Sequence, residues 1–136
     1  MVISTKGRYA LRMMMDLAQH GEDGFVSLKH ISQRQEVSLK YLEAITASLN
    51  RAGLVLSQRG KEGGYQLSRP ANEITVAEVL HSAEGSLAAV SCNAIEQSSC
   101  ERADHCLTLP LWKHLDTIMD DYLSGVTIQD VLDGKV

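Results

Sequence analysis

Residues 38–68, SLKYLEAITASLNRAGLVLSQRGKEGGYQLS, decide the fold of this chain. In the first half of this stretch, apolar side chains recur at the spacing of one helical face. The spacing predicts a helix from Leu39 to Ala52 that Ser38 caps and Gly53 ends. Its packed stripe is expected to be Leu39, Leu42, Ile45 and Leu49. The opposite side of the helix is left free to contact a partner.

The second half of the stretch predicts a β-hairpin. Two short alternating runs, at 54–57 and 65–68, flank a glycine-rich basic turn over 58–64. Such a tip can approach a phosphate backbone only if it accepts positive φ and carries little side-chain bulk. We expect Gly60, Gly63 and Gly64 to meet both needs.

Two further helices are expected ahead of this stretch. Apolar spacing predicts a first helix over 5–20, and Ser27 is a suitable N-cap for a short helix that stops near 35–37. Two short helices joined by a tight turn and followed by a hairpin form a helix-turn-helix with a wing. In that arrangement the second helix enters the major groove of DNA with its N-terminal end toward the bases.

This geometry assigns an expected DNA contact to each of several side chains. Glu43 is suited to accept from a cytosine amine, and Lys40 is suited to meet a phosphate or a guanine. Ser38 and Tyr41 can donate to phosphates, and the charge and planar shape of Arg59 suit a narrow minor groove. The candidate DNA contacts are Ser38, Lys40, Tyr41, Glu43, Arg59, Gly60, Lys61, Gly63 and Gly64.

Charge is divided unevenly along the chain. Residues 1–70 carry ten Lys and Arg against six Asp and Glu, whereas residues 71–136 carry three against eleven. This division suits a polyanion-binding module attached to a part that avoids the polyanion. We expect a DNA-binding region at 1–72 and a second region at 73–136, within one compact domain. Because only six of the 136 residues are aromatic, we expect a mainly α fold with a small β-hairpin.

The second region predicts three helices and a loop. Thr75 with Glu78 forms a capping box for a helix that ends near Gly85, and Pro110 suits the first turn of a long helix. Thr127 with Asp130 caps a short terminal helix. The apolar face of the long helix is wide, and we expect it to pack on its symmetry mate in a homodimer.

Several function classes are not expected. No apolar run is long enough to cross a bilayer and the first residues lack a signal-peptide core, so we expect a cytoplasmic protein without a membrane partner. We find no nucleophile with a paired base, no phosphate loop and no convergent carboxylates. The sequence therefore predicts a protein that is not an enzyme and has no small-molecule substrate.

The three cysteines, Cys92, Cys100 and Cys106, fall in one loop over 91–107 with the spacing C-x7-C-x5-C. An odd number of thiols in a reducing compartment argues against a disulfide framework, and the absence of a C-x-x-C pair weakens a zinc-ribbon interpretation. Thiolates are soft ligands that suit iron–sulphur clusters. A zinc- or thiol-based redox regulator is the alternative.

Three motifs carry a resemblance to a known family. Ser4-Thr5-Lys6-Gly7-Arg8-Tyr9-Ala10, Ser38-Leu39-Lys40-Tyr41-Leu42-Glu43 and Arg59-Gly60-Lys61-Glu62-Gly63-Gly64-Tyr65 together resemble the IscR, NsrR and CymR family of bacterial winged-helix regulators. The resemblance implies homodimers that bind double-stranded operator DNA, with Tyr41, Glu43 and Arg59 among the contacts. Ala44 departs from the Gln that the family often has there, so a different operator preference is expected.

The resemblance extends to the cysteines. Cluster-binding members carry three cysteines in this loop, followed by a stretch like Leu107-Thr108-Leu109-Pro110-Leu111-Trp112. The resemblance implies a [2Fe–2S] or [4Fe–4S] cluster. Such a cluster would control operator affinity in response to iron–sulphur status, redox state or nitric oxide. The residues that supply the fourth ligand in relatives are not present here: Leu109 stands where some have a histidine, and Arg8 where others have an acidic residue. His105 is the candidate in their place, and a cofactor-free regulator of cysteine metabolism is a further alternative.

Overall fold

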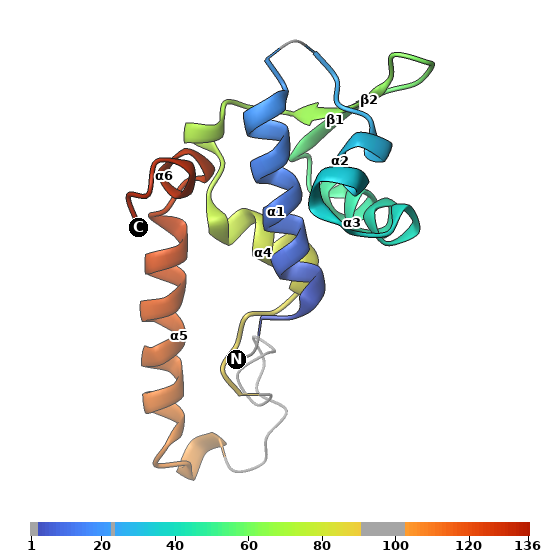
Figure 1. Ribbon diagram of the computed structural model, residues 1–136. Coiled ribbons are helices and arrows are strands. Elements are labelled where there is room, and N and C mark those ends of the chain that lie inside the picture. The colour runs from blue at the N-terminus through green and yellow to red at the C-terminus, as the bar shows by residue number, and fades with distance from the viewer. Residues whose placement is uncertain (1–2, 23, 91–102) are drawn as a thin grey trace.

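The computed structural model describes residues 3–22, 24–90 and 103–136, and Figure 1 shows them as a bundle of short helices with a hairpin at one end and a long helix along one side. The predicted fold class, mainly α with a small antiparallel hairpin, is confirmed. The elements in chain order are α1 (Thr5–His20), α2 (Leu28–Gln35), α3 (Leu39–Arg51), β1 (Val55–Gln58), β2 (Gly64–Leu67), η1 (Ala71–Glu73), α4 (Val76–Glu84), η3 (Ala103–His105), α5 (Leu109–Ser124) and α6 (Ile128–Leu132).

Side-chain caps fix where the helices begin. Ser27 and Ser38 each accept a hydrogen bond from the backbone N–H three residues ahead, as the sequence predicts. Between α2 and α3 the turn is made by Glu36, whose φ of 55° lies in the left-handed region. Both predicted capping boxes are present, at the start of α4 and at the start of α6.

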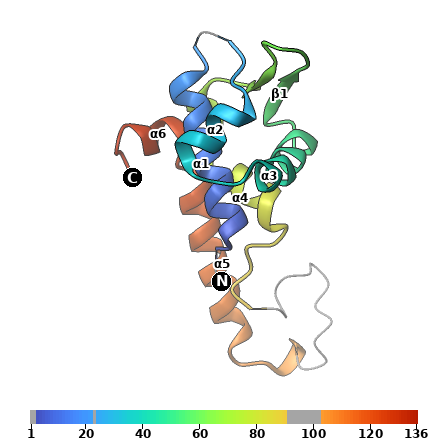
Figure 2. The same ribbon diagram turned by 45° about the vertical axis from the view of Figure 1, so that its right-hand side comes forward.

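The core is built around α1. Figure 2 shows this helix passing behind α2 and α3, and its inner face packs against α3, α4, α6 and the hairpin. Removal of this apolar surface from water is the main stabilisation of the bundle. The largest fully buried apolar side chains are Met13, Met14, Leu17, Ile31, Leu42, Ile45, Leu49, Ile74, Val79 and Ile128.

One expectation for α3 needs correction. Leu39 is 45% exposed and does not pack, because it is the first residue of α3 and stands beyond the buried face that begins at Leu42. Buried polar residues complete that face instead: Thr46 donates from Oγ1 to the carbonyl of Leu42 at 2.9 Å, and Ser48 accepts from Lys6 Nζ at 2.9 Å. Helical spacing therefore predicts the face of α3 but not its first residue.

The hairpin pairs one residue away from the predicted positions. Val55 pairs with Leu67 and Gln58 with Gly64, so that the strands are 55–58 and 64–67. Leu54 is buried next to the end of α3, and its carbonyl accepts from the N–H of Ser68 at 3.0 Å. The packing of Leu54 on the core thus sets where the free strand begins.

The C-terminal elements pack on the body through α4 and α1. The N–H of Val76 donates to the Val126 carbonyl at 2.8 Å, and the N–H of Ile128 donates to the Ile74 carbonyl at 2.9 Å. These bonds tie the start of α6 to the start of α4 and leave α5 alongside α4 (Figure 1). Within the described residues, no helix is both long enough and apolar enough to cross a membrane.

Candidate nucleic-acid interface and cysteine segment

The N-terminal end of α3 presents several exposed side chains. Ser38, Lys40 and Glu43 are all exposed, and a shallow hollow of about 340 Å³ lies beside them, lined by Ser38, Lys40, Tyr41 and Ala44. Figure 1 shows this helix and the hairpin tip on the same side of the molecule. A helix end and a β-ribbon exposed together on one side have the arrangement in which winged helices contact DNA.

Tyr41 differs from its exposed neighbours because it is half-buried. Its ring meets the ring of Tyr9 in α1 edge to face, with 5.8 Å between ring centroids and an interplanar angle of 84°. Tyr9 in turn lies under the guanidinium of Arg12, whose Cζ is 4.9 Å from the ring centroid. Tyr41 therefore packs as well as facing outward, whereas the sequence pattern predicts only an outward-facing side chain.

A buried carboxylate anchors the end of α2. Asp16 of α1 is 1% exposed and accepts from Arg34 at 2.6 Å and 3.0 Å and from Gln35 Nε2 at 3.0 Å. Burial acts to raise the pKa of Asp16, but the hydrogen bonds from Arg34 and Gln35 and the charge of Arg34 outweigh it, so the pKa is lowered. A charged Asp16 thus holds α2 on α1, directly before the turn into α3.

The hairpin tip carries the predicted basic residues on its surface. Arg59, Gly60 and Lys61 are exposed, and the N–H of Gly63 donates to the carbonyl of Gly60 at 3.0 Å to close the tip. Gly60 has a φ of 110° with open space around it, which fits the predicted need for positive φ.

Gly64 has the predicted positive φ, at 156°, whereas Gly63 does not, and at both positions a side chain would also clash with nearby backbone. A Cβ at Gly64 would lie 2.1 Å from the carbonyl oxygen of Val26, and a Cβ at Gly63 would lie 2.2 Å from that of Gln58. Val26 pairs with Tyr65 through two backbone hydrogen bonds of 2.8 Å. Gly64 therefore allows the hairpin to lie close to the chain ahead of α2, and Gly63 allows the tip to close tightly on the end of β1.

This pairing creates a cleft that the sequence does not indicate. About 500 Å³ of space separates the hairpin from the start of α2. Its lining residues are Gly24, Phe25, Ser27, His30, Gln58, Lys61, Glu62 and Gly63. No local pattern reveals the Val26–Tyr65 pairing, because the two residues lie far apart in sequence and a single paired residue has no period.

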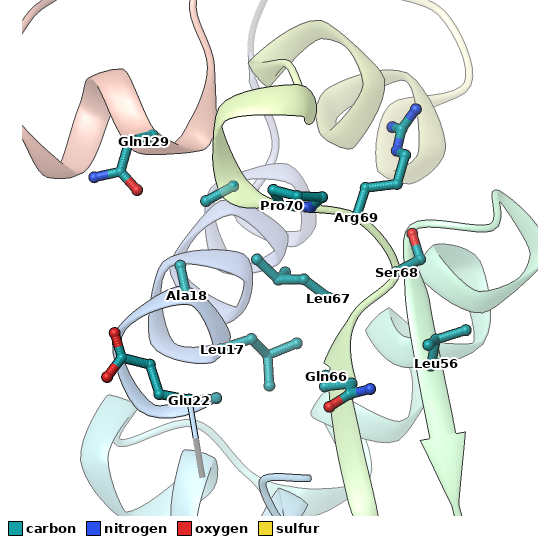
Figure 3. A pocket seen from close by; sticks show the side chains of 12 residues that line it. Leu17, Ala18, Glu22, Leu56, Gln66, Leu67, Ser68, Arg69, Pro70 and Gln129 are labelled. Carbon is teal, nitrogen blue, oxygen red and sulfur yellow. The ribbon is translucent and has the colours of Figure 1, made fainter. Parts of the chain in front are cut away.

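Another hollow of about 610 Å³ lies on the body between the end of α1, the hairpin and α6. Figure 3 shows Leu17 and Leu67 on its floor, with Glu22 and Gln129 at its edge. Arg69, also at its edge, is paired with Glu78 at 2.7 Å. The lining brings together no set of charged groups that would favour a particular ligand.

The cysteines fall mostly outside the described part of the chain. Cys92 and Cys100 lie in the segment 91–102, which the structure does not describe. Cys106 is half-buried just after η3, with its Sγ 3.3 Å from Thr108 Oγ1, and the neighbouring His105 is exposed. Among residues 3–22, 24–90 and 103–136, no three His, Cys, Asp or Glu side chains gather closely enough to hold a metal ion.

The chain just before the cysteine segment is anchored to two helices, α5 and α1. Before it, the N–H of Ala89 donates to Asp116 Oδ1 of α5 at 2.7 Å. Glu84, the last residue of α4, accepts from the N–H of Ser4 at 2.8 Å and from its hydroxyl at 2.6 Å. A Cβ at Gly7 would lie 2.3 Å from the same carboxylate oxygen, so this contact depends on a glycine in α1. Sequence reasoning missed the contact, because it joins residues 80 positions apart.

Comparisons with known proteins agree with this geometry. Residues 3–134 match the Rrf2 family, described as an iron-dependent transcriptional regulator. The chain is 42% identical to the HTH-type transcriptional regulator IscR of Pectobacterium atrosepticum over 135 residues, which cover 99% of this chain and 81% of that protein. The structure of T. potens IscR superimposes with a TM-score of 0.79 and 37% identity, covering 100% of this chain and 89% of that one. The structure of CymR, the global cysteine regulator of B. subtilis, superimposes with a TM-score of 0.77 and 35% identity, covering 96% of this chain and 95% of that one.

Proposed function

The chain belongs to the Rrf2 family of transcriptional regulators, and on that premise we propose that it binds operator DNA as a homodimer whose affinity is set by an iron–sulphur cluster. Of the relatives named above, IscR of Pectobacterium atrosepticum is a transcriptional regulator and CymR of B. subtilis is a global cysteine regulator. One observation carries the proposal. The segment that holds all three cysteines joins α4, which packs on α1 and α3, to α5, which exposes an apolar face.

DNA contact is proposed for the exposed end of α3 and for the hairpin. Lys40 and Glu43 present one donor and one acceptor side chain at the helix end, and both kinds of group read base edges in the major groove. Ser38 and the outer edge of Tyr41 flank them and suit phosphates. Arg59 and Lys61 add positive charge at the hairpin tip, which favours the minor groove and the backbone.

Dimerisation is proposed through α5. Four large side chains along one face of this helix are exposed: Leu111 at 59%, Leu115 at 37%, Ile118 at 52% and Tyr122 at 57%. A contiguous apolar stripe on a helix favours association, and the same stripe on a second copy is self-complementary about a two-fold axis. Two copies would then present two recognition helices to two half-sites of an operator.

The donor set of the cysteine segment suits an iron–sulphur cluster. Cys92, Cys100 and Cys106 supply three soft thiolates, and His105 is the local candidate for the fourth position. When bound, such a group supplies reversible redox chemistry and reactivity toward oxygen or nitric oxide. The chain's own contribution is to connect the segment to α5 through the Ala89–Asp116 contact, and the preceding helix α4 to the DNA-binding body through the Glu84–Ser4 contact. Because operator DNA lies in the cytoplasm of a bacterium, we expect the protein to act there.

The test is anaerobic purification followed by an absorption spectrum and by iron and sulphide analysis of the full chain. The proposal predicts a coloured protein in which iron and sulphide are present in similar amounts, and a Cys100→Ala variant that is colourless but still dimeric. A colourless wild-type protein without iron would contradict the cluster, and a coloured Cys100→Ala variant would remove that cysteine from the ligand set.

A second candidate is a thiol-based or cofactor-free regulator of cysteine metabolism. The structural similarity to CymR favours it. This candidate predicts a colourless protein, containing zinc or reduced thiols, whose operator affinity does not depend on iron. The same anaerobic preparation therefore separates the two candidates.

A further inference from the structure

Arg12 lies where the first three helices of the DNA-binding body meet. Its Nε donates to Gln35 Oε1 at 3.0 Å, and its Nη2 donates to the main-chain carbonyl of Gln35. Gln35 is the last residue of α2 and directly precedes the left-handed Glu36 that makes the turn into α3. One side chain of α1 therefore holds the start of that turn through two separate hydrogen bonds.

The face of the same guanidinium covers Tyr9, with Cζ 4.9 Å from the ring centroid. Tyr9 in turn supports Tyr41 through the edge-to-face contact. Tyr41 lies in the first turn of α3, between the exposed Lys40 and the exposed Glu43. The position of this helix end is thus fixed at two points, the turn before it and the ring within it, and Arg12 reaches both.

We propose that Arg12 is a positioning residue for operator recognition, which holds the N-terminal end of α3 in place without itself contacting DNA. This inference rests on the proposed function, because it assumes that α3 reads the operator. Two of the five N–H donors of Arg12 are engaged with Gln35 and its flat face is engaged with Tyr9. A lysine has neither the fork nor the flat face, so it is a poor substitute for this role.

The competing explanation is that Arg12, which is exposed, neutralises a DNA phosphate. The two roles predict different salt dependence. Each phosphate contact contributes about 0.9 to the slope of log K against log salt concentration on any duplex. A positioning residue contributes nothing to that slope, but its loss lowers affinity for the operator alone.

The experiment measures anaerobic binding of the full chain and its Arg12→Lys and Arg12→Gln variants to two duplexes over a range of salt. One duplex is the operator selected by the wild type from a random-sequence library, and the other is a scrambled duplex of equal length. We expect both variants to lose about tenfold in operator affinity, with unchanged slope and unchanged affinity for the scrambled duplex. Full binding by Arg12→Lys, or a slope lowered by about one in Arg12→Gln, would overturn the inference.

Variants of Tyr9 test the contact that runs from Arg12 through Tyr9 to Tyr41. Tyr9→Phe keeps the ring and should keep operator affinity, whereas Tyr9→Leu should lower it, because Tyr41 loses its support while the hydrogen bonds of Arg12 to Gln35 remain. The loss in the double variant Arg12→Gln/Tyr9→Leu should be smaller than the sum of the two single losses, because both variants disturb the contact between Arg12 and the Tyr9 ring. Fully additive losses would contradict the role of that contact. Arg69→Gln is the matched control, since Arg69 pairs with Glu78 at 2.7 Å outside this network and its loss should change nothing.

A measurement without DNA separates failure of this inference from failure of the proposed function. The near-ultraviolet circular dichroism of the tyrosines should change in Arg12→Gln and stay unchanged in Arg69→Gln. If the wild type selected no operator, the proposed function would be wrong. An unchanged tyrosine signal in Arg12→Gln would instead show that Arg12 does not hold the rings, which would overturn the inference.

Discussion

The ring of Tyr9 meets the ring of Tyr41 edge to face, 5.8 Å between centroids and at 84°, and this contact joins α1 directly to the first turn of α3. Aromatic pairs of this geometry contribute about 0.5–1.5 kcal/mol beyond the burial of their surfaces. Tyr41 thus has two kinds of surroundings, since its ring packs on Tyr9 and the residue also lines the hollow next to Lys40. The two can be tested separately.

Replacing Tyr41 by Phe removes the hydroxyl and keeps the ring. We expect the free energy of unfolding to stay within about 0.5 kcal/mol of wild type, while operator affinity falls about fivefold because a phosphate contact is lost. Tyr41→Ala should lower both quantities. Urea unfolding and fluorescence anisotropy measure them, and a Tyr41→Phe variant with wild-type affinity would remove the hydroxyl from the DNA interface.

Adding a methyl group to Gly64 should displace the hairpin. Its Cβ would lie 2.1 Å from the Val26 carbonyl oxygen, and backbone has to move to relieve that overlap. We expect Gly64→Ala to destabilise the fold by about 2 kcal/mol or more. Gly60→Ala, with open space around it, should cost only about 1 kcal/mol for its left-handed backbone. Equal urea midpoints for the two variants would contradict the close approach of Val26.

The lowered pKa of Asp16 predicts a stability that depends on pH. Because the folded protein holds this carboxyl in its charged form more strongly than the unfolded chain does, the contribution is complete above the unfolded pKa of about 4. It is lost as pH falls through the lower folded pKa. Asp16→Asn should be about 1–2 kcal/mol less stable than wild type near pH 7, since Arg34 loses a charged partner.

The difference between wild type and Asp16→Asn should therefore shrink as the solution is acidified below about pH 4. Glu78 and Asp130 also have lowered pKa values, so the wild-type curve alone would combine three groups. Urea unfolding of both proteins at matched pH isolates Asp16. A difference that stayed constant down to pH 2 would show that the charge of Asp16 contributes nothing.

A charge on the exposed stripe of α5 should separate the proposed dimer. Ile118 is 52% exposed within a row of apolar side chains, and Ile118→Glu would place a carboxylate in the interface between two copies. We expect a folded monomer in analytical ultracentrifugation. Thr117→Glu adds the same charge at the adjacent exposed position outside this row and should leave the dimer intact. A dimeric Ile118→Glu protein would place the interface elsewhere.

Local signals predicted most of the fold. Ser27 and Ser38 mark helix starts because a cap acts within three residues, and the Thr75–Glu78 box is equally local. Leu39 shows the limit of this reasoning, since spacing alone cannot tell where a packed face begins.

The site residues stay a prediction, but their exposure was foreseen and the contacts that support them were not. Lys40 and Glu43 are exposed as the pattern indicates. The supports join positions that are distant in sequence, as Tyr9 does with Tyr41 and Ser4 with Glu84, and a single aromatic or polar contact leaves no periodic trace. Gly64 was identified as necessary and has the predicted positive φ, but the close carbonyl of Val26, which also excludes a side chain there, was not foreseen.

We propose that the three cysteines control the affinity of α3 and the hairpin for DNA. The most direct measurement compares the operator affinity of the anaerobically purified protein before and after chelation of its iron, with a Cys92→Ala/Cys100→Ala/Cys106→Ala variant alongside. The account predicts at least about a tenfold change on chelation, and a variant that binds like the chelated protein whether or not iron is present. Equal affinity of all three for every selected operator would contradict it.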